Sequence, residues 1–475
     1  MAFPAALNRI TPSNSGFDQH PLYGPFSPSS DHASLELRDQ PMQGYAAYPG
    51  PDPTLAGTLP RAQQSPVAAH LPYWVLVGAV SFNAVLAFIN GNVTTLSPAA
   101  VIAAELFFIG TAVAIALTHY RSKMAIPIAF IVWLFLFMIL RSAIVDPASS
   151  IKFFRDVLIA PVFVMLGLCT DRRLLVPYLL FIHVFVVTFG ALEAFNTPLY
   201  SSLFHIKSYF INTRGLSEEN FWNTDSDLFV SATRTGSRFI SWADNIMAAH
   251  RVSSIFLEPV SLGAYCIVIA GVTFSLWRSL SLITRTALLG STFFLIVACD
   301  GRLAVASVFF VAAACACWRI LPRAMPILYL PVILLLCFLF VSVTNQVSGN
   351  DDFPGRIAWT VELLKDFDVA DLLGASDAHL DRAVDSGVGY LILSQSVFGL
   401  IIFWIYTSSA THYANREQIC YTHAIALYVA FNALISYGFL SIKTAALIWM
   451  IRGVLEDRQT PPWLPPRHSE GLPTL

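Results

Sequence analysis

The sequence predicts an all-α protein that crosses a membrane many times. Of its 475 residues, 56% are hydrophobic and only 12% are charged, and the mean hydropathy is +0.62. Apolar runs of about twenty residues, the length of a helix that crosses a bilayer, follow one another between residues 71 and 455. This composition is typical of a polytopic membrane protein, so the lipid bilayer is an expected partner.

Charge and cysteine content argue against several other classes of protein. The formal net charge is −2 and no long basic run occurs, so no nucleic-acid partner is expected. The 7 cysteines form no C-x-x-C pair, which argues against a zinc site or a disulfide framework. The sequence has no phosphate-binding glycine loop and no nucleotide fingerprint. We therefore expect neither a metal nor another cofactor.

Residues 1–70 are expected to form a disordered tail, and residues 456–475 a second, shorter one. The first is rich in Pro, Ser, Gly and Gln and has no sustained apolar period, so it cannot bury enough surface to offset the entropy of ordering. It also lacks the charged start, apolar core and cleavage site of a secretory signal peptide. The first apolar run is therefore expected to act as the insertion signal.

Residues 71–455 form the predicted membrane domain, with about twelve transmembrane helices. We expect the spans near residues 71–90, 99–119, 124–145, 156–170, 174–195, 259–277, 283–299, 303–321, 326–344, 387–408, 419–437 and 439–455. Lysines and arginines, from Arg121 and Lys123 to Arg416, fall in alternate connections, and such residues favour the cytoplasm. This alternation places both termini in the cytoplasm and requires the short fourth span.

Two long polar connections, near residues 196–258 and 345–386, then lie on the outer face. Connections of this length are mostly functional or disordered. Between two apolar runs, Asp300-Gly301-Arg302 predicts a tight turn in which the glycine makes the turn and Arg302 reaches the outer face. Charge at membrane depth is costly and tends to mark a site, although a simple contact between Asp300 and Arg302 is the competing interpretation.

The first long connection enters the next apolar run through the stretch from Arg251 to Gly263. Pro259 suits the first position of a helix, and Glu258 before it favours the positive end of the helix dipole. A helix start with an arginine nearby is suited to hold an anionic group. Anchoring of the helix end in the membrane interface is the competing interpretation for Arg251.

Four polar residues lie within the predicted spans, where each is a candidate functional residue. They are Glu105, His183, Glu193 and Lys443. For His183, a neutral and hydrogen-bonded interior residue is the competing interpretation. Glu193 and Lys443 lie close to the outer ends of their spans, where a long side chain can reach water without any other role.

Several arginines on one face imply an anionic ligand, because a guanidinium binds phosphate through two parallel hydrogen bonds. The candidates are Arg251, Arg302 and Arg356. A carboxylate among them, Glu258 or Asp385, is a candidate general base for a hydroxyl nucleophile. For each carboxylate, an arginine partner or a helix cap is the competing interpretation.

Short motifs in the second half of the chain resemble the O-antigen ligase and Wzy-type polysaccharide polymerase superfamily. They are R-V-S-S-I-F-L-E-P-V-S-L-G at 251–263, D-G-R-L-A at 300–304, G-R-I-A-W at 355–359, G-A-S at 374–376, D-S-G-V-G-Y-L at 385–391 and G-L at 399–400. The resemblance covers roughly residues 250–405, and the order of the motifs carries it.

This resemblance implies a metal-independent membrane glycosyltransferase of C-type architecture in the bacterial inner membrane. Its donors are sugars linked to undecaprenyl pyrophosphate on the periplasmic face. Arg251 and Arg302 would line the donor pyrophosphate, and Arg356 would support the donor or the acceptor site. Asp300 and His379 belong to the same predicted substrate site.

The expected function is polymerisation of lipid-linked repeat units into an exopolysaccharide or O-antigen. Ligases of the superfamily show a histidine where this chain has Asp385, and His379 lies six residues earlier, so ligation is the second expectation. A flippase and a chain-length regulator are the expected protein partners. A secondary transporter, which would show internal repeats, broken helices and deep charges, and a non-catalytic scaffold are the alternatives from other classes.

Overall fold

The structure is a computed structural model that describes residues 66–216, 228, 232, 238–344, 346, 348, 353–409 and 415–456. All of these residues belong to one compact unit, Gln63–Leu475. Across them the secondary structure is helical, with no strand. Most of the two predicted tails lies outside the described residues, as do parts of both long connections.

Within the described residues, a helix lies at each of the twelve predicted apolar runs. These helices are α1 (Pro66–Asn92), α2 (Pro98–Thr118), α3 (Ala125–Ser142), α4 (Pro147–Leu168), α5 (Leu175–Phe195), α8 (Pro259–Ser275), α9 (Leu282–Ala298), α10 (Arg302–Ala316), α11 (Met325–Thr344), α14 (Gly387–Ser408), α15 (Arg416–Ala433) and α16 (Ile442–Glu456). The all-α prediction is therefore confirmed for the described part of the chain.

Six of these helices are long and apolar enough to cross a membrane: α1, α2, α3, α5, α11 and α14. Helices α8, α9 and α10 are apolar but shorter, with 15 to 17 residues. The twelve-span topology thus stays a prediction. The outer helices support a lipid environment, because only 17% of the apolar window of α11 is buried within the protein. A surface this apolar is stable against lipid rather than water.

Helix α4 begins earlier than predicted, at Pro147 instead of residue 156. Asp146 caps the helix, because its carboxylate accepts a hydrogen bond of 3.0 Å from the backbone N–H of Ser149. The proline after it suits the first helical position. The predicted span begins at Asp156, whereas the helix also includes Arg155 and the eight residues before it.

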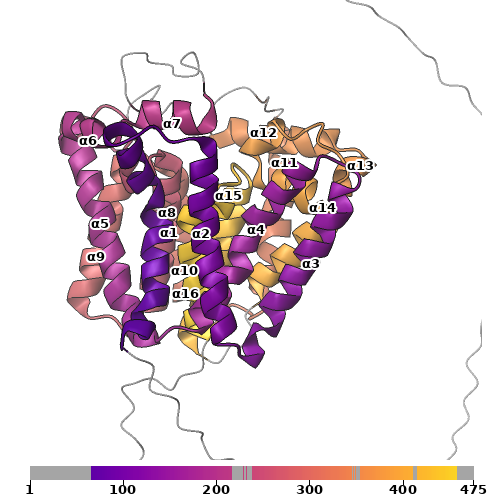
Figure 1. Cartoon of the computed structure of the whole chain (residues 1–475), viewed down its shortest axis with the longest axis horizontal. Helices are drawn as coiled ribbons and strands as arrows, with labels where there is room; N and C mark the ends of the chain where they lie inside the picture. The colour runs from indigo at the N-terminus through magenta and orange to yellow at the C-terminus, as the bar shows by residue number, and fades with distance from the viewer. Residues whose placement is uncertain are drawn as a thin grey trace, which may run out of the picture. The chain divides into compact units, whose positions relative to one another are not determined.

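The connections carry further helices that lie across one end of the long helices (Figure 1). They are α6 (Thr197–Phe204) and α7 (Ile206–Arg214) in the first connection and α12 (Phe353–Asp366) and α13 (Val369–Leu372) in the second. We refer to this end of the unit as the α7/α12 end.

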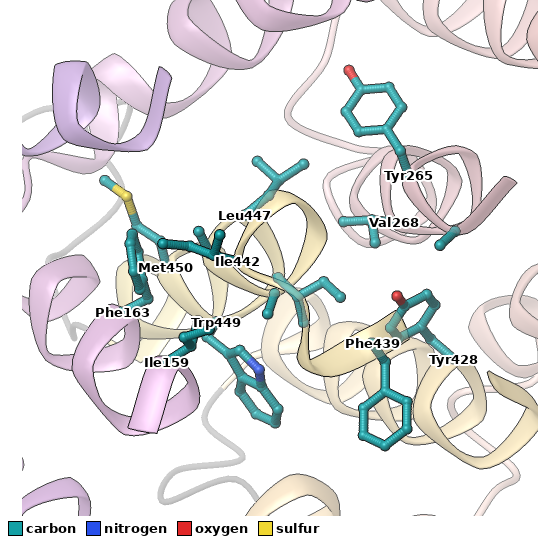
Figure 2. Close-up of a cluster of buried hydrophobic side chains, with 14 of the residues drawn as sticks. Ile159, Phe163, Tyr265, Val268, Tyr428, Phe439, Ile442, Leu447, Trp449 and Met450 are labelled. Carbon is teal, nitrogen blue, oxygen red and sulfur yellow. The ribbon is translucent and has the colours of Figure 1, made fainter. Parts of the chain in front are cut away.

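Helices α4 and α16 pack most closely, at the centre of the hydrophobic core. A Cβ atom on Gly167 would lie 2.1 Å from the carbonyl oxygen of Met450, and one on Gly453 would lie 2.1 Å from that of Val164. The two backbones therefore touch, as at small-residue contacts between membrane helices. Figure 2 shows Trp449 of α16 among the buried side chains around this contact.

Helix α14 is broken in its middle at Ser396, whose φ of 65° and ψ of 169° are not helical. The carbonyl of Leu393, next to the break, accepts a hydrogen bond of 3.3 Å from Nε of Arg141. Gly374 also packs here, because a Cβ atom at this residue would lie 3.0 Å from the backbone nitrogen of Ser396. The second long connection is thereby fixed to α14.

Candidate functional site

The stretch from Arg251 to Glu258 is held by a buried carboxylate at the end of α5. Glu193 has no exposed surface, and it accepts hydrogen bonds of 2.8 and 2.6 Å from the backbone N–H groups of Ser253 and Ser254. The prediction that Glu193 reaches toward water is therefore wrong. Burial of this carboxylate is compensated by the fixed N–H donors, which orient the segment leading into α8.

Helix α8 begins at Pro259 as predicted, with Glu258 immediately before it. Leu257 precedes them in the left-handed conformation, with a φ of 60°. This turn directs the chain from the Glu193-bound segment into the helix.

The predicted tight turn between α9 and α10 is present, but its left-handed residue is Asp300, with a φ of 48°, rather than Gly301, with a φ of −81°. Gly301 is required for packing instead. A Cβ atom there would lie 3.0 Å from Sγ of Cys299 and 3.2 Å from Cβ of Ala304. Aspartate tolerates the left-handed region better than most residues, which explains why the turn forms without a glycine at that position.

Three predicted site residues meet at this turn. Nη2 of Arg302 lies 3.9 Å from Oδ2 of Asp300, and Nε of Arg251 donates a hydrogen bond of 3.0 Å to the carbonyl of Cys299. The side chain of Arg302 is 66% exposed. The turn therefore presents two guanidinium groups at the α7/α12 end.

Glu258 binds two cations that no sequence pattern pairs with it. Its carboxylate lies 2.7 Å from Nη2 of Arg214 in α7 and 2.8 Å from Nζ of Lys443 in α16. Burial raises the pKa of Glu258, but the charges of Lys443 and Arg214 outweigh it and lower this pKa to about 2. A carboxylate with so low a pKa is a weak base, which disfavours Glu258 as the general base.

Asp385 lies in a different environment at the start of α14. One of its oxygens is 3.6 Å from Nη1 of Arg356, and its side chain is 59% exposed. Arg356 also donates a hydrogen bond of 3.5 Å to the carbonyl of Ile435. Two further predicted residues are thus adjacent, and the carboxylate is accessible.

His379 lies beside residues other than those predicted for it. Its Nε2 is 3.5 Å from Oδ2 of Asp371, and its ring packs at 5.9 Å from that of Phe367. These contacts place it against α13 and the end of α12.

The structure also brings Glu105, a candidate from the sequence, together with two charged residues of α4 that the sequence does not single out. Nη1 of Arg155 lies 3.1 Å from Oε2 of Glu105 in α2, and its Nη2 lies 2.8 Å from Oδ1 of Asp156. The hydroxyl of Tyr390 in α14 donates a hydrogen bond of 2.6 Å to Asp156. The ring of Tyr390 stacks on that of Tyr437, with 4.4 Å between centroids.

This group and the Glu258 group are close enough to interact electrostatically. Glu105 interacts with Lys443 and Arg214, and Tyr437 interacts with both groups. We call the six ionisable residues the charged network: Glu105, Arg155, Asp156, Arg214, Glu258 and Lys443. A sequence signal for part of it existed in the pair Asp146-Pro147, which marks the true start of α4.

Among the residues that the structure describes, no three His, Cys, Asp or Glu side chains gather as they would around a metal ion. Comparisons with protein-family models, with curated proteins and with solved structures found no match for this chain. The resemblance of the short motifs to the polymerase and ligase superfamily therefore stays a prediction.

Proposed function

We propose that the protein is a membrane glycosyltransferase that polymerises undecaprenyl-pyrophosphate-linked repeat units into an exopolysaccharide or O-antigen. In this proposal the twelve helices span the bacterial inner membrane, both termini are cytoplasmic and the α7/α12 end is periplasmic. The observation that carries the proposal is the meeting of Arg251, Asp300 and Arg302 at one turn beside the start of α8.

The chemistry of this turn suits a pyrophosphate. Charge develops on the leaving pyrophosphate as the bond to the sugar breaks, and fixed guanidinium groups stabilise that charge. Arg302 is the more exposed of the donors on the turn, so its side chain can reach a bound lipid headgroup. Arg251 is fixed through the carbonyl of Cys299 and supplies a second positive charge next to it.

The acceptor hydroxyl must lose a proton as it attacks the anomeric carbon of the donor. Asp385 is the better candidate base, because it is exposed and has one arginine at 3.6 Å, whereas Glu258 is held by two cations at under 3 Å. The proton passes from the hydroxyl to the carboxylate, and the pyrophosphate leaves with the electrons of the broken bond. Arg356 then keeps Asp385 in place.

Polymerisation is favoured over ligation because no histidine stands at the position of Asp385. His379, which could have replaced it, packs against α12 and α13 instead. A flippase that supplies the donor and a chain-length regulator are the partners that this activity would need.

A secondary transporter is the second candidate, and two observations favour it. Helix α14 is broken at Ser396, and Arg155 and Asp156 lie inside α4. Broken helices and buried charges line the substrate sites of many carriers.

Deletion of the gene separates the candidates. A polymerase mutant should retain single repeat units on the carrier lipid at the periplasmic face and lack long polymer. Polymer of normal chain length in the mutant would contradict the proposal.

A further inference from the structure

The charged network occupies helices as well as connections, and its position is unusual for charged residues. Arg155 is eight residues from the beginning of α4, or about 12 Å along the helix axis, and Glu105 is about 10 Å into α2. Glu105 lies on the face of α2 that carries the buried residues Ile109 and Ala112, so it faces the protein interior. These charges are therefore enclosed by helices rather than directed at lipid.

Ion pairs enclosed by helices can serve stability alone, but several side chains of the charged network keep exposed surface that a ligand could contact. The side chains of Glu105 and Arg155 keep 21% and 20% of their surface exposed, and Asp156 keeps 10%. By contrast, the carboxylate of Glu193, which fixes the segment before α8, has no exposed surface. Glu258 and Arg214 keep 18% and 46%, whereas Lys443 keeps only 4%. Most of the network thus remains in reach of small molecules although it lies between helices.

The charge balance of the network indicates which ligand it suits. Three cations (Arg155, Arg214 and Lys443) face three carboxylates (Glu105, Asp156 and Glu258), so the formal charges cancel. A phosphate group only accepts hydrogen bonds, and three carboxylates would repel it. A sugar hydroxyl both donates and accepts, so it can pair with carboxylates and guanidinium groups at once.

An aromatic surface accompanies these charges. Tyr437 is partly exposed and stacks on the buried Tyr390, which is itself bonded to Asp156. The C–H faces of a pyranose ring pack well on aromatic rings, whereas a phosphate gains little from them. Alternating charges beside an aromatic pair are a suitable surface for a neutral polyhydroxylated ligand.

We infer that the charged network, together with Tyr390 and Tyr437, binds the sugar portion of a glycan, while the Asp300 turn binds its phosphate. The inference rests on the proposed function for the identity of the glycan. It divides the α7/α12 end into two subsites: Arg251 and Arg302 near α10 for the anion, and the charged network between α2, α4 and α16 for the sugar.

The test measures binding to the full-length protein in lipid nanodiscs, without turnover. One probe is a set of oligosaccharides made by partial acid hydrolysis of the cell's own polysaccharide, and the other is inorganic pyrophosphate. The network variants are Glu105→Gln, which keeps the shape of the side chain, and Tyr437→Leu, which lies in a connection and leaves every ion pair in place. The matched control is Arg302→Met.

Each network variant should bind the oligosaccharides at least about tenfold more weakly and bind pyrophosphate as the wild type does. Arg302→Met should show the reverse pattern. The inference is overturned if the wild type binds no oligosaccharide, if both network variants bind it unchanged, or if the network variants lose pyrophosphate instead. Because binding is measured without polymerisation, this result and the outcome of the gene deletion can fail separately.

Discussion

Two kinds of buried charge in this protein differ in what they bind. Arg238 is 2% exposed, and its guanidinium donates hydrogen bonds of 2.8 and 2.7 Å to the carbonyls of Val297 and Ala298 and of 2.8 Å to that of His250. The charged network instead joins mainly side chains to side chains, although Nζ of Lys443 also donates a hydrogen bond of 3.2 Å to the carbonyl of Phe256. A backbone partner cannot move without unfolding a segment, whereas a side-chain partner can turn toward a ligand.

The partners and the exposed fraction of a side chain therefore distinguish stabilising charges from candidate site charges within one membrane domain. Arg238 joins the first connection to the end of α9, and Glu193 joins α5 to the segment before α8. Both therefore position the Asp300 turn and Glu258 without being part of the site. Lys443 is 3% exposed, but the side chains of Glu105, Arg155, Arg214 and Glu258 keep between 18% and 46% of their surface exposed, as ligand-binding groups require.

The largest expected effect is on stability, in Arg238→Met. This change removes the several hydrogen bonds of a buried guanidinium and should lower the free energy of unfolding by about 3–5 kcal/mol. Thermal unfolding of the purified protein in detergent measures it. The same change at the 66% exposed Arg302 is the matched control and should cost less than about 0.5 kcal/mol. Equal losses of unfolding free energy in Arg238→Met and Arg302→Met would show that Arg238 is not a stabilising charge of a different kind.

The second effect is a pH dependence that belongs to Glu258. Its pKa in the folded protein is about 2, below the ordinary value of 4.5. Ionised Glu258 therefore stabilises the fold above pH 4.5, and this contribution of about 3 kcal/mol is lost as the pH falls from 4.5 toward 2. The variant Glu258→Gln should lack this part of the acid-induced loss. If the free energy of unfolding fell with pH in the same way in the wild type and the variant, the two cations would not stabilise the ionised carboxylate of Glu258.

A smaller effect is expected where a network side chain loses one hydrogen bond. Tyr390→Phe removes the donor to Asp156, which retains Arg155, so the free energy of unfolding should fall by about 2 kcal/mol. Tyr120→Phe, at a tyrosine that is 64% exposed, serves as the control for the loss of a hydroxyl. If Tyr390→Phe lowered the free energy of unfolding as much as Arg238→Met does, the charged network would stabilise the fold in the same way as Arg238.

Much of the helical arrangement could be predicted from the sequence, because long apolar runs report burial or lipid contact directly. The exception is the start of α4, because the charged residues Arg155 and Asp156 interrupt the apolar run, whereas the cap Asp146-Pro147 marks the start of the helix. Helix α16, with only 15 residues, can still be predicted near its observed position, because Lys443 lies at its start and leaves the apolar run of residues 445–451 uninterrupted.

The candidate site was only partly predictable. Asp300 and Arg302 are neighbours in sequence, so their proximity follows from a tight turn. The partners of Glu258 come from residues 214 and 443, and the group around Asp156 comes from α2, α4 and α14, so no local pattern reports these contacts. Pairing of side chains across distant helices depends on the packing of the whole unit.

Our proposal is that the Asp300 turn and Asp385 catalyse transfer of a glycan from a lipid pyrophosphate. Its most direct test is the polymerisation rate of the purified protein in lipid, supplied with repeat units on undecaprenyl pyrophosphate. We predict polymer from the wild type, loss of activity in Arg251→Lys and Arg302→Lys with membrane insertion unchanged, and a loss of about a hundredfold or more in Asp385→Asn. Absence of polymer with the wild type, or full activity in all three variants, would contradict the account.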